Sequence, residues 1–517
     1  MVILEDILNI VEREVKEESE NITQIALTFF SAYTGNPQNT RILAPSGEGK
    51  TYLVLKVANH FPSDDVIILS KATPQSIKYN LNSKRVIENG DGNFQDYDVA
   101  IKPLEDEISK TKDKEKQQEL KNQIRELQNS AYDYIDFEYK TIVLVDSQSA
   151  ELFETLKTTL SHDKEFQKSF SVNKSKSGTI SGQKFVFHGW PSLIYCSAKD
   201  EQKHDQTNEM NTRFHTISLR TTGKKYRKML EHQAVVSSIP NSFYQEEILS
   251  GFEIGELNLK VESMINDLKG NSEIFNPFGI GLSGLFEDDA GYRTRQLKIL
   301  DNNICVHTLV NRKNRPKIIY KDEIIPISTW FDIETACNLT KNPREIQPYK
   351  IKQFNKKIRP AILEHGKELS LVDGNTKGLT ASEILAHIDK KSENGRQKLQ
   401  ETILKPLVDQ GFLEETEDPN DKRKYIYYLP KKYLNNDAII ESTLIDISLL
   451  DDSCVDSFVR KYLKQRFEKG ELTIEDEKGN SINPQQLIEL VKNRHSITQN
   501  RHELDNSDSS IDVEEKK

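Results

Sequence analysis

Short apolar runs recur along the first half of the chain and predict the strands of a sheet. They occupy residues 42–43, 66–69, 141–145, 192–197 and 214–219. Consecutive apolar residues are typical of strands that are buried on both faces, as in a parallel sheet covered by helices. Segments with helical spacing lie between these runs, so the pattern predicts an α/β fold.

Two stretches break this pattern with helical spacing of their own. Residues 1–40 place Ile3, Ile7 and Ile10 on one apolar face and lead into the first strand. Residues 103–131 are densely charged, with apolar residues at helical intervals, and we expect a helical hairpin inserted between the second and third strands. A solvated arm and a partner-binding coiled coil are both compatible with such a hairpin.

Residues 170–187 predict a long β-hairpin. Alternating phenylalanine and valine residues flank a tip that is rich in lysine, serine and glycine. The tip carries Lys174 and Lys176, which are candidate DNA contacts. A hairpin that only faces solvent is the alternative.

The C-terminal part predicts a winged helix. A capping box at 380–383 opens one helix, a second helix spans about 393–410, and two strands follow at 412–415 and 424–429. Cations on the second helix and at the wing can neutralise phosphates beside a major groove. The candidate DNA contacts are Arg396, Lys398, Lys405, Lys422, Arg423 and Lys424. Winged helices also bind proteins, and that alternative stays open.

Composition limits the classes of protein that the chain can belong to. Of its 517 residues, 36% are hydrophobic and 29% charged, and no apolar run approaches the roughly 20 residues that span a bilayer. The acidic N-terminus does not resemble a secretion signal, and the 4 cysteines form no C-x-x-C pair, so we expect a reducing cytoplasm. With a net charge of −10, any nucleic-acid binding must come from local basic patches.

These patterns divide the chain into six expected parts. They are an N-terminal helical segment at 1–40, an α/β core at 41–230 that contains the segment from Ala44 to Thr51, a helical region at 231–340, a winged helix at 341–435, a helical segment at 436–497 and an acidic disordered tail at 498–517.

The segment from Ala44 to Thr51 carries the most specific chemistry. It fits the phosphate-loop pattern with alanine in place of the leading glycine. In such a loop, backbone N–H groups face the β-phosphate, a lysine reaches the β- and γ-oxygens, and a hydroxyl binds Mg²⁺. The residues expected to contact the nucleotide are Ser46, Gly47, Glu48, Gly49, Lys50, Thr51 and Tyr52. We therefore expect ATP with Mg²⁺.

An acidic residue that holds the metal should follow a hydrophobic strand. Asp146 comes directly after the run at 141–145 and would bind Mg²⁺ through water, together with the Thr51 hydroxyl.

The assembled motifs resemble the AAA+-like phosphate-loop ATPases encoded with replication genes of phages, plasmids and proviruses, including those that accompany primases. The resemblance covers about residues 35–315 and is clearest in ILAPSGEGKTYL, IVLVDSQSAELFETLKTTLSHD and NTRFHTISL. It implies a homo-oligomer, with a primase or another replication protein as a possible partner.

The resemblance also implies roles for individual residues. Ser197 would sense the γ-phosphate, and Arg213 would reach the site of the neighbouring subunit. Arg293 or Arg295 would match the sensor arginine of the lid, and the hairpin at 170–187 would grip single-stranded DNA.

One position departs from the resemblance. Such ATPases usually place glutamate directly after the magnesium aspartate, whereas Ser147 and Gln148 follow Asp146. Serine is no general base at neutral pH, so the water-orienting role must pass to another group, for which Glu151 and Glu154 are the candidates, or hydrolysis is slow or absent.

Two hypotheses follow: an ATP-dependent DNA-remodelling motor, such as a replicative helicase or its loader, and a nucleotide-gated DNA-binding switch that hydrolyses little. A small-molecule kinase would have no use for the winged helix.

Overall fold

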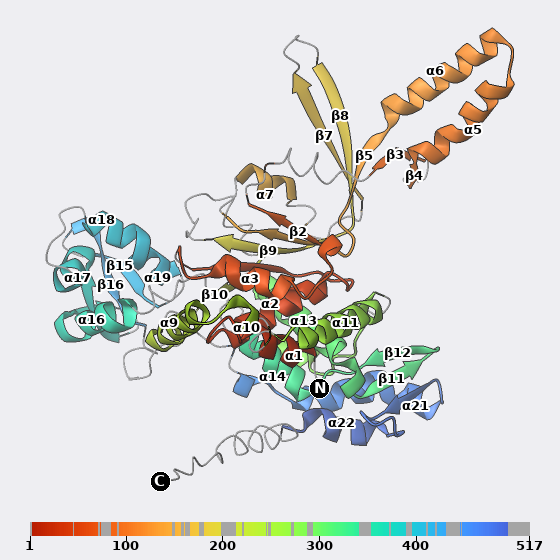
Figure 1. Cartoon of the computed structure of the whole chain (residues 1–517). Helices are drawn as coiled ribbons and strands as arrows, with labels where there is room; N and C mark the ends of the chain where they lie inside the picture. The colour runs from red at the N-terminus through yellow and green to blue at the C-terminus, as the bar shows by residue number, and fades with distance from the viewer. Residues whose placement is uncertain are drawn as a thin grey trace.

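The computed structural model has an α/β architecture built around two sheets of five strands each, with two smaller sheets towards the C-terminus (Figure 1). It describes residues 3–44, 46–70, 73, 84–89, 93–146, 150–156, 160, 166–174, 180–197, 213–219, 222–244, 246, 250–269, 273–286, 293–340, 353–371, 374–388, 395–409, 412–418, 421–430, 445 and 447–494. Within these ranges the side chains of 154–155, 171–174, 180–183, 293, 355–356, 370–371, 374–375, 409 and 422–423 lie outside the description. Among the described residues, no helix combines the length and the apolar character that a bilayer crossing requires.

The central sheet is entirely parallel and confirms the five predicted strands. Its strands are β1 (Asn39–Leu43), β2 (Val66–Leu69), β6 (Thr141–Leu144), β9 (Ser192–Ser197) and β10 (His215–Ser218). Their order in space is β10-β1-β9-β6-β2. The first strand therefore lies between two strands that come late in the sequence.

Side chains alternate between the two covered faces of this sheet. Ile42, Val143 and Ile194 pack into one core with the N-terminal helices, whereas Ile142 and Leu193 pack into a second core on the opposite face. Both faces are buried, which explains why the strands show continuous apolar runs rather than alternation.

Helices cover each of the two faces. The larger core lies against α1 (Ile3–Val11), α2 (Ser19–Ser31), α3 (Lys50–Ala58), α11 (Gly251–Leu268) and α13 (Arg293–Val310). The opposite face is covered by α7 (Ala150–Leu156). In Figure 1, α7 lies on one side of the sheet and α2 and α3 lie on the other. The short α10 (Asn241–Phe243) follows α9 (Gly223–Ser238).

The second five-stranded sheet was not foreseen from the sequence. It contains β3 (Lys84–Glu88), β4 (Phe94–Asp96), β5 (Tyr132–Asp136), β7 (Phe166–Lys174) and β8 (Ile180–His188), in the order β4-β3-β5-β8-β7. Its last two strands are the predicted hairpin.

The predicted helical arm is present and begins earlier than expected. It consists of α5 (Tyr97–Lys110) and α6 (Lys114–Ser130). The side chains of Asp96 and Asp113 cap the two helices by accepting hydrogen bonds from the backbone N–H groups of Asp98 and Glu115. The structure describes every residue of the arm, and only Ile101 and Leu120 are buried. The arm therefore projects from the body (Figure 1).

Two distant parts of the chain share one small sheet. The strands β11 (Lys317–Tyr320) and β12 (Glu323–Pro326) pair with β17 (Leu472–Glu475), and the sheet order is β12-β11-β17. One core joins helices from both parts of the chain. The earlier part contributes α12 (Gly279–Leu282), α13 and α14 (Trp330–Leu339), and the later part contributes α20 (Ser453–Val459), η10 (Arg460–Lys464) and α22 (Pro484–Lys492). The short α21 (Gln465–Glu468) follows η10. No local pattern in the C-terminal helical segment predicts the strand that it contributes here.

The region predicted as a winged helix has its own core. Its elements are η6 (Phe354–Ile358), α16 (Arg359–His365), β13 (Lys367–Leu371), β14 (Gly374–Thr380), α17 (Ala381–Ile388), α18 (Gly395–Leu399), η7 (Gln400–Leu404), α19 (Lys405–Asp409), β15 (Glu414–Asp418) and β16 (Asp421–Tyr428). The sheet order is β13-β14-β16-β15.

Two features of this region bear on the sequence prediction. Glu383 accepts hydrogen bonds from the backbone and the hydroxyl of Thr380, as the predicted capping box requires. The predicted second helix contains a π-helical stretch, η7, between α18 and α19.

Candidate functional site

The predicted phosphate loop joins the carboxyl end of β1 to the start of α3. Gly47 and Gly49 have φ values of +88° and +86°, in the left-handed region. Side chains strain the backbone there, so these two positions require glycine. Pro45 lies outside the described residues, whereas the rest of the loop leads directly into Lys50 as the first residue of α3.

Lys50 points back across this loop. Its Nζ donates a hydrogen bond to the carbonyl oxygen of Ala44 at 2.7 Å. Burial lowers the pKa of Lys50, while the nearby Cys196, Glu48 and Asp146 act in the opposite direction. The ammonium group is therefore partly withdrawn from water and lies close to the aspartate that the sequence singled out.

Asp146 follows β6 and is exposed. The hydroxyl of Thr51 donates to the carbonyl oxygen of Val145, the residue directly before Asp146, at 3.4 Å. Lys50, Thr51 and Asp146 thus come together at the carboxyl edge of the central sheet. Ser147 and Gln148 lie outside the described residues, as does the side chain of Glu154, and Glu151 is exposed in the first turn of α7.

Ser197 ends β9 directly beside the loop. It is fully buried, it pairs in register with Leu43, and its carbonyl oxygen accepts a hydrogen bond from the Ala44 N–H at 3.3 Å. The preceding residue, Cys196, was missed by sequence reasoning. Burial raises the pKa of the Cys196 thiol to about 12, so the group next to Lys50 is a neutral thiol.

Contacts made by two predicted nucleotide residues extend the site to other elements. Glu48 accepts a hydrogen bond from the hydroxyl of Tyr226 on α9 at 2.9 Å. The hydroxyl of Tyr52 donates to Glu14 at 3.2 Å, and Lys56 pairs with the same carboxylate at 2.6 Å. The loop and α3 are therefore connected to α9 and to the N-terminal segment. No sequence pattern predicts these roles for Tyr226 or Glu14.

Arg213 lies at the opposite edge of the sheet. It comes just before β10, which runs parallel to β1 with Thr40 beside His215, so Arg213 is at the amino ends of the strands. A strand rises about 3.3 Å per residue, so the length of β1 separates Arg213 from the loop. Arg213 does not approach Lys50 within one chain.

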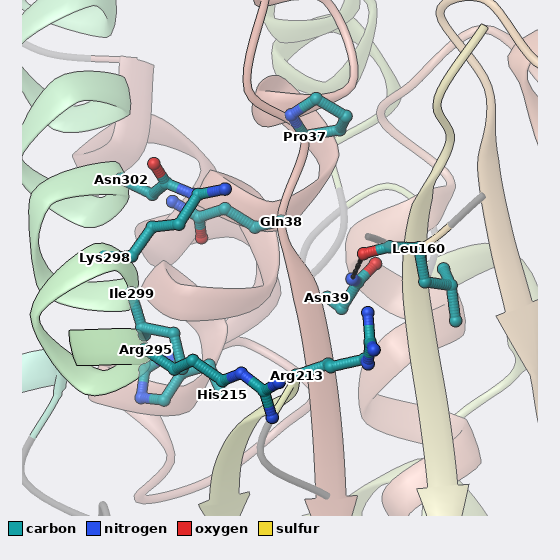
Figure 2. A pocket seen from close by; sticks show the side chains of 10 residues that line it. All are labelled: Pro37, Gln38, Asn39, Leu160, Arg213, His215, Arg295, Lys298, Ile299 and Asn302. Atoms are coloured by element: carbon teal, nitrogen blue, oxygen red, sulfur yellow. Dashed lines mark hydrogen bonds between the residues drawn. The ribbon is translucent and has the colours of Figure 1, made fainter. Parts of the chain in front are cut away.

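A cavity of about 130 Å³ adjoins Arg213. Arg295 and Lys298 reach this cavity from α13, and the buried ring of His215 also lines it (Figure 2). Burial lowers the pKa of His215 to about 4, so the ring is neutral at pH 7. The resemblance matched Arg293 or Arg295 to the sensor arginine of the lid. Arg295 lines the cavity with Arg213, and the side chain of Arg293 lies outside the description.

The candidate DNA contacts are described unequally. Arg396, Lys398 and Lys405 are exposed on the α18–α19 segment. Lys424 is exposed on β16 and forms an ion pair with Asp421 at 3.2 Å. Lys176 and the side chains of Lys174, Lys422 and Arg423 lie outside the described residues.

Comparison with models of known protein families finds no match, and comparison with curated proteins finds no significant similarity. The functional assignment therefore depends on the chemistry and geometry of the chain itself.

Proposed function

We propose that the chain is an AAA+-like phosphate-loop ATPase that remodels DNA as an oligomer, in the role of a replicative helicase or its loader. The observation that carries this proposal is the position of the loop at 44–51. The loop lies at the carboxyl edge of an all-parallel sheet. From β1 the chain continues towards β2 on one side of β1, whereas β10 lies next to β1 on the other side. Open α/β sheets bind ligands where the strand order reverses in this way.

The residues present fit ATP and Mg²⁺. Two left-handed glycines give a tight turn at a helix N-terminus, where backbone N–H groups attract phosphate. Lys50 would pair with the phosphates, Thr51 and Asp146 would hold the metal, and Ser197 would contact the γ-phosphate. Bound Mg²⁺ supplies charge neutralisation for phosphoryl transfer.

Arg213 supports the oligomeric part of the proposal. It lies a strand's length from Lys50 and faces a cationic cavity with Arg295 and Lys298. We propose that it acts on nucleotide bound by a neighbouring subunit, because it is too far from the loop of its own chain.

Two regions would contact DNA. The order helix, strands, two helices and two strands in 353–430 suits a winged helix, with Lys398 and Lys405 exposed on its last helical segment. The β7–β8 hairpin, with Lys174 and Lys176 at its tip, would contact a single strand. A primase or another replication protein would be the partner.

A nucleotide-gated switch is the second candidate, favoured by one observation. Asp146 is followed by Ser147, and Glu151 is exposed one turn into the next helix. If no carboxylate polarises water, the protein would bind ATP and assemble on DNA without rapid turnover.

Steady-state ATPase measurements with and without single-stranded DNA test the two candidates. Strong stimulation by DNA is expected of the motor. Tight nucleotide binding with negligible turnover would favour the switch, and absence of ATP·Mg²⁺ binding would refute both.

A further inference from the structure

One face of the second sheet carries aromatic side chains that the proposed nucleotide site does not use. Residues alternate between the two faces of a strand. Ile135, Phe185 and Phe187 point into the core of the main body. Tyr132, Tyr134, Phe166, Phe170, Lys184 and His188 therefore share the other face.

The rings on this face form a continuous strip across four strands. Ring centroids lie 6.5 Å apart for Phe170 and Tyr132, 5.7 Å for Tyr132 and Phe94, and 5.2 Å for Phe94 and Phe166. The His188 ring continues the strip, 4.8 Å from Phe166 and 5.7 Å from Tyr134. We name this set of six rings the aromatic strip.

The aromatic strip is open to solvent at one end, at Phe170. Phe170 is 64% exposed, while Phe94, Tyr132, Phe166 and His188 are partly buried. Val86, Tyr134 and Val186 are buried on this face, and they form a small cluster against which Phe94, Tyr132 and Phe166 pack. The exposed ring of Phe170, which adjoins the Tyr132 ring, therefore offers a planar apolar surface of the kind on which a planar ligand can stack.

Lysines surround the strip. The Nζ atoms of Lys184 and Lys168 lie 5.7 Å and 5.9 Å from the ring centroid of Tyr132. The Nζ atom of Lys84 lies 4.9 Å from the ring centroid of Tyr134. Two acids on this face are already compensated: Glu88 pairs with Lys168, and Asp136 pairs with His188 at 3.0 Å. Among the described residues, Lys84 and Lys184 have no acidic partner.

We propose that the aromatic strip is a stacking platform for single-stranded nucleic acid. Bases stack on exposed rings irrespective of sequence, and adjacent lysines neutralise the phosphates. Phe170 and Lys184 lie on β7 and β8, the two strands of the predicted DNA-contacting hairpin, and they are partners in its register. This inference rests on the proposed function, which supplies the class of partner. Binding of nucleic acid to the platform requires no ATP.

The test measures binding of labelled oligo(dT) and oligo(rU) by fluorescence anisotropy in the absence of ATP. Phe170→Ala should weaken binding on the order of 10-fold, the effect of losing one stacked base. Because Phe170 is 64% exposed, this variant should fold normally. Phe170→Tyr should retain affinity, and Phe252→Ala, at a ring that is 75% exposed on α11, is the matched control and should have no effect.

Salt dependence separates stacking from charge. Lys184→Ala should weaken binding and reduce the salt slope by about one phosphate contact, whereas Phe170→Ala should leave the slope unchanged. Binding of oligo(dT) alone or of oligo(rU) alone would support the platform and identify the sugar that it accepts.

The platform and the proposed motor can fail separately. Equal affinity of wild type, Phe170→Ala and Lys184→Ala would overturn the platform and leave the ATPase assignment intact. Failure of the wild type to bind either oligonucleotide at low salt would also overturn it. Ring-dependent binding without any ATP turnover would support the platform and count against the motor.

Discussion

Lys50 is the residue on which the proposed chemistry depends most directly. Its ammonium lies near Asp146 and reaches across the loop to Ala44. Lys50→Ala removes a preorganised cation from the proposed site of phosphate transfer, and such deletions cost on the order of 10²–10³-fold in turnover. We expect ATPase activity and DNA unwinding to be lost, as measured by phosphate release and strand displacement.

A matched control is available on α11. Lys260 is exposed and pairs with Asp6 of α1 at 2.8 Å, away from the loop. Lys260→Ala should retain most of the turnover, because it removes only an exposed ion pair. Full unwinding by Lys50→Ala would refute the motor assignment.

His215 makes stability depend on pH. Its pKa falls to about 4 because the ring is buried, while the nearby backbone of Leu339 acts the other way. Between about pH 6.5 and 4 the unfolded chain therefore binds a proton that the folded chain does not, so stability falls as the pH decreases. The loss approaches about 3 kcal/mol at pH 4.

The neutral substitution His215→Gln should remove this component. Urea unfolding of the wild type and of the variant at pH 7 and pH 4.5 isolates the contribution of His215. Other groups that titrate in this range contribute equally to both proteins; one is Asp301, whose pKa is raised to about 6 by burial. The free energy of unfolding should fall less in the variant between these two pH values. Identical pH dependence in both proteins would contradict the assignment.

At the scale of elements, Asp332 fixes α14 to α13. This fully buried carboxylate accepts two hydrogen bonds from Arg315, at 2.7 and 2.8 Å, and one contact of 2.6 Å joins it to His307 on α13. Desolvation by burial acts to raise its pKa, but the contacts with His307 and Arg315 prevail and hold the pKa well below its usual value. Asp332→Ala leaves Arg315 buried without its carboxylate and should cost about 3–5 kcal/mol.

Denaturant unfolding measures this cost. Glu334→Ala, at an exposed position on the same helix, is the control and should change stability by less than about 0.5 kcal/mol. A small effect of Asp332→Ala would show that the buried network contributes little to joining the helices.

Elements with a local signal were predictable, and long-range pairings were not. The strands at 66–69, 141–144 and 192–197 are apolar runs, and the α5–α6 arm has helical spacing. The strand β5 gives only a weak run, YDYID, and its partners β3 and β8 are separated from it in the sequence. Nothing local specifies the pairing of β11 with β17.

The same distinction applies to the candidate site. The glycines, Lys50 and Thr51 form one contiguous motif, and Asp146 ends an apolar run, so the sequence predicted them. Tyr226 reaches Glu48 only because α9 packs beside the loop, and Arg295 meets Arg213 only because α13 packs against the amino edge of the sheet. Such contacts depend on tertiary packing.

At the scale of the whole molecule, the two charged sites lie at opposite edges of one sheet. The loop with Lys50 is at the carboxyl edge, and the cavity with Arg213, Arg295 and Lys298 is at the amino edge. A chain with this layout can complete a shared site only by placing its amino edge against the carboxyl edge of another copy. A head-to-tail arrangement of this kind closes into a ring or extends as a filament.

A mixing experiment tests whether the site is shared. Arg213→Ala should bind nucleotide normally and lose turnover, because it lacks the arginine needed by its neighbour. Lys50→Ala lacks the loop lysine and keeps Arg213. In mixed oligomers, some interfaces join an intact Lys50 to an intact Arg213, so two inactive proteins should regain a measurable fraction of wild-type phosphate release. No recovery in verified mixed oligomers, or unchanged turnover in Arg213→Ala alone, would count against a site completed between subunits.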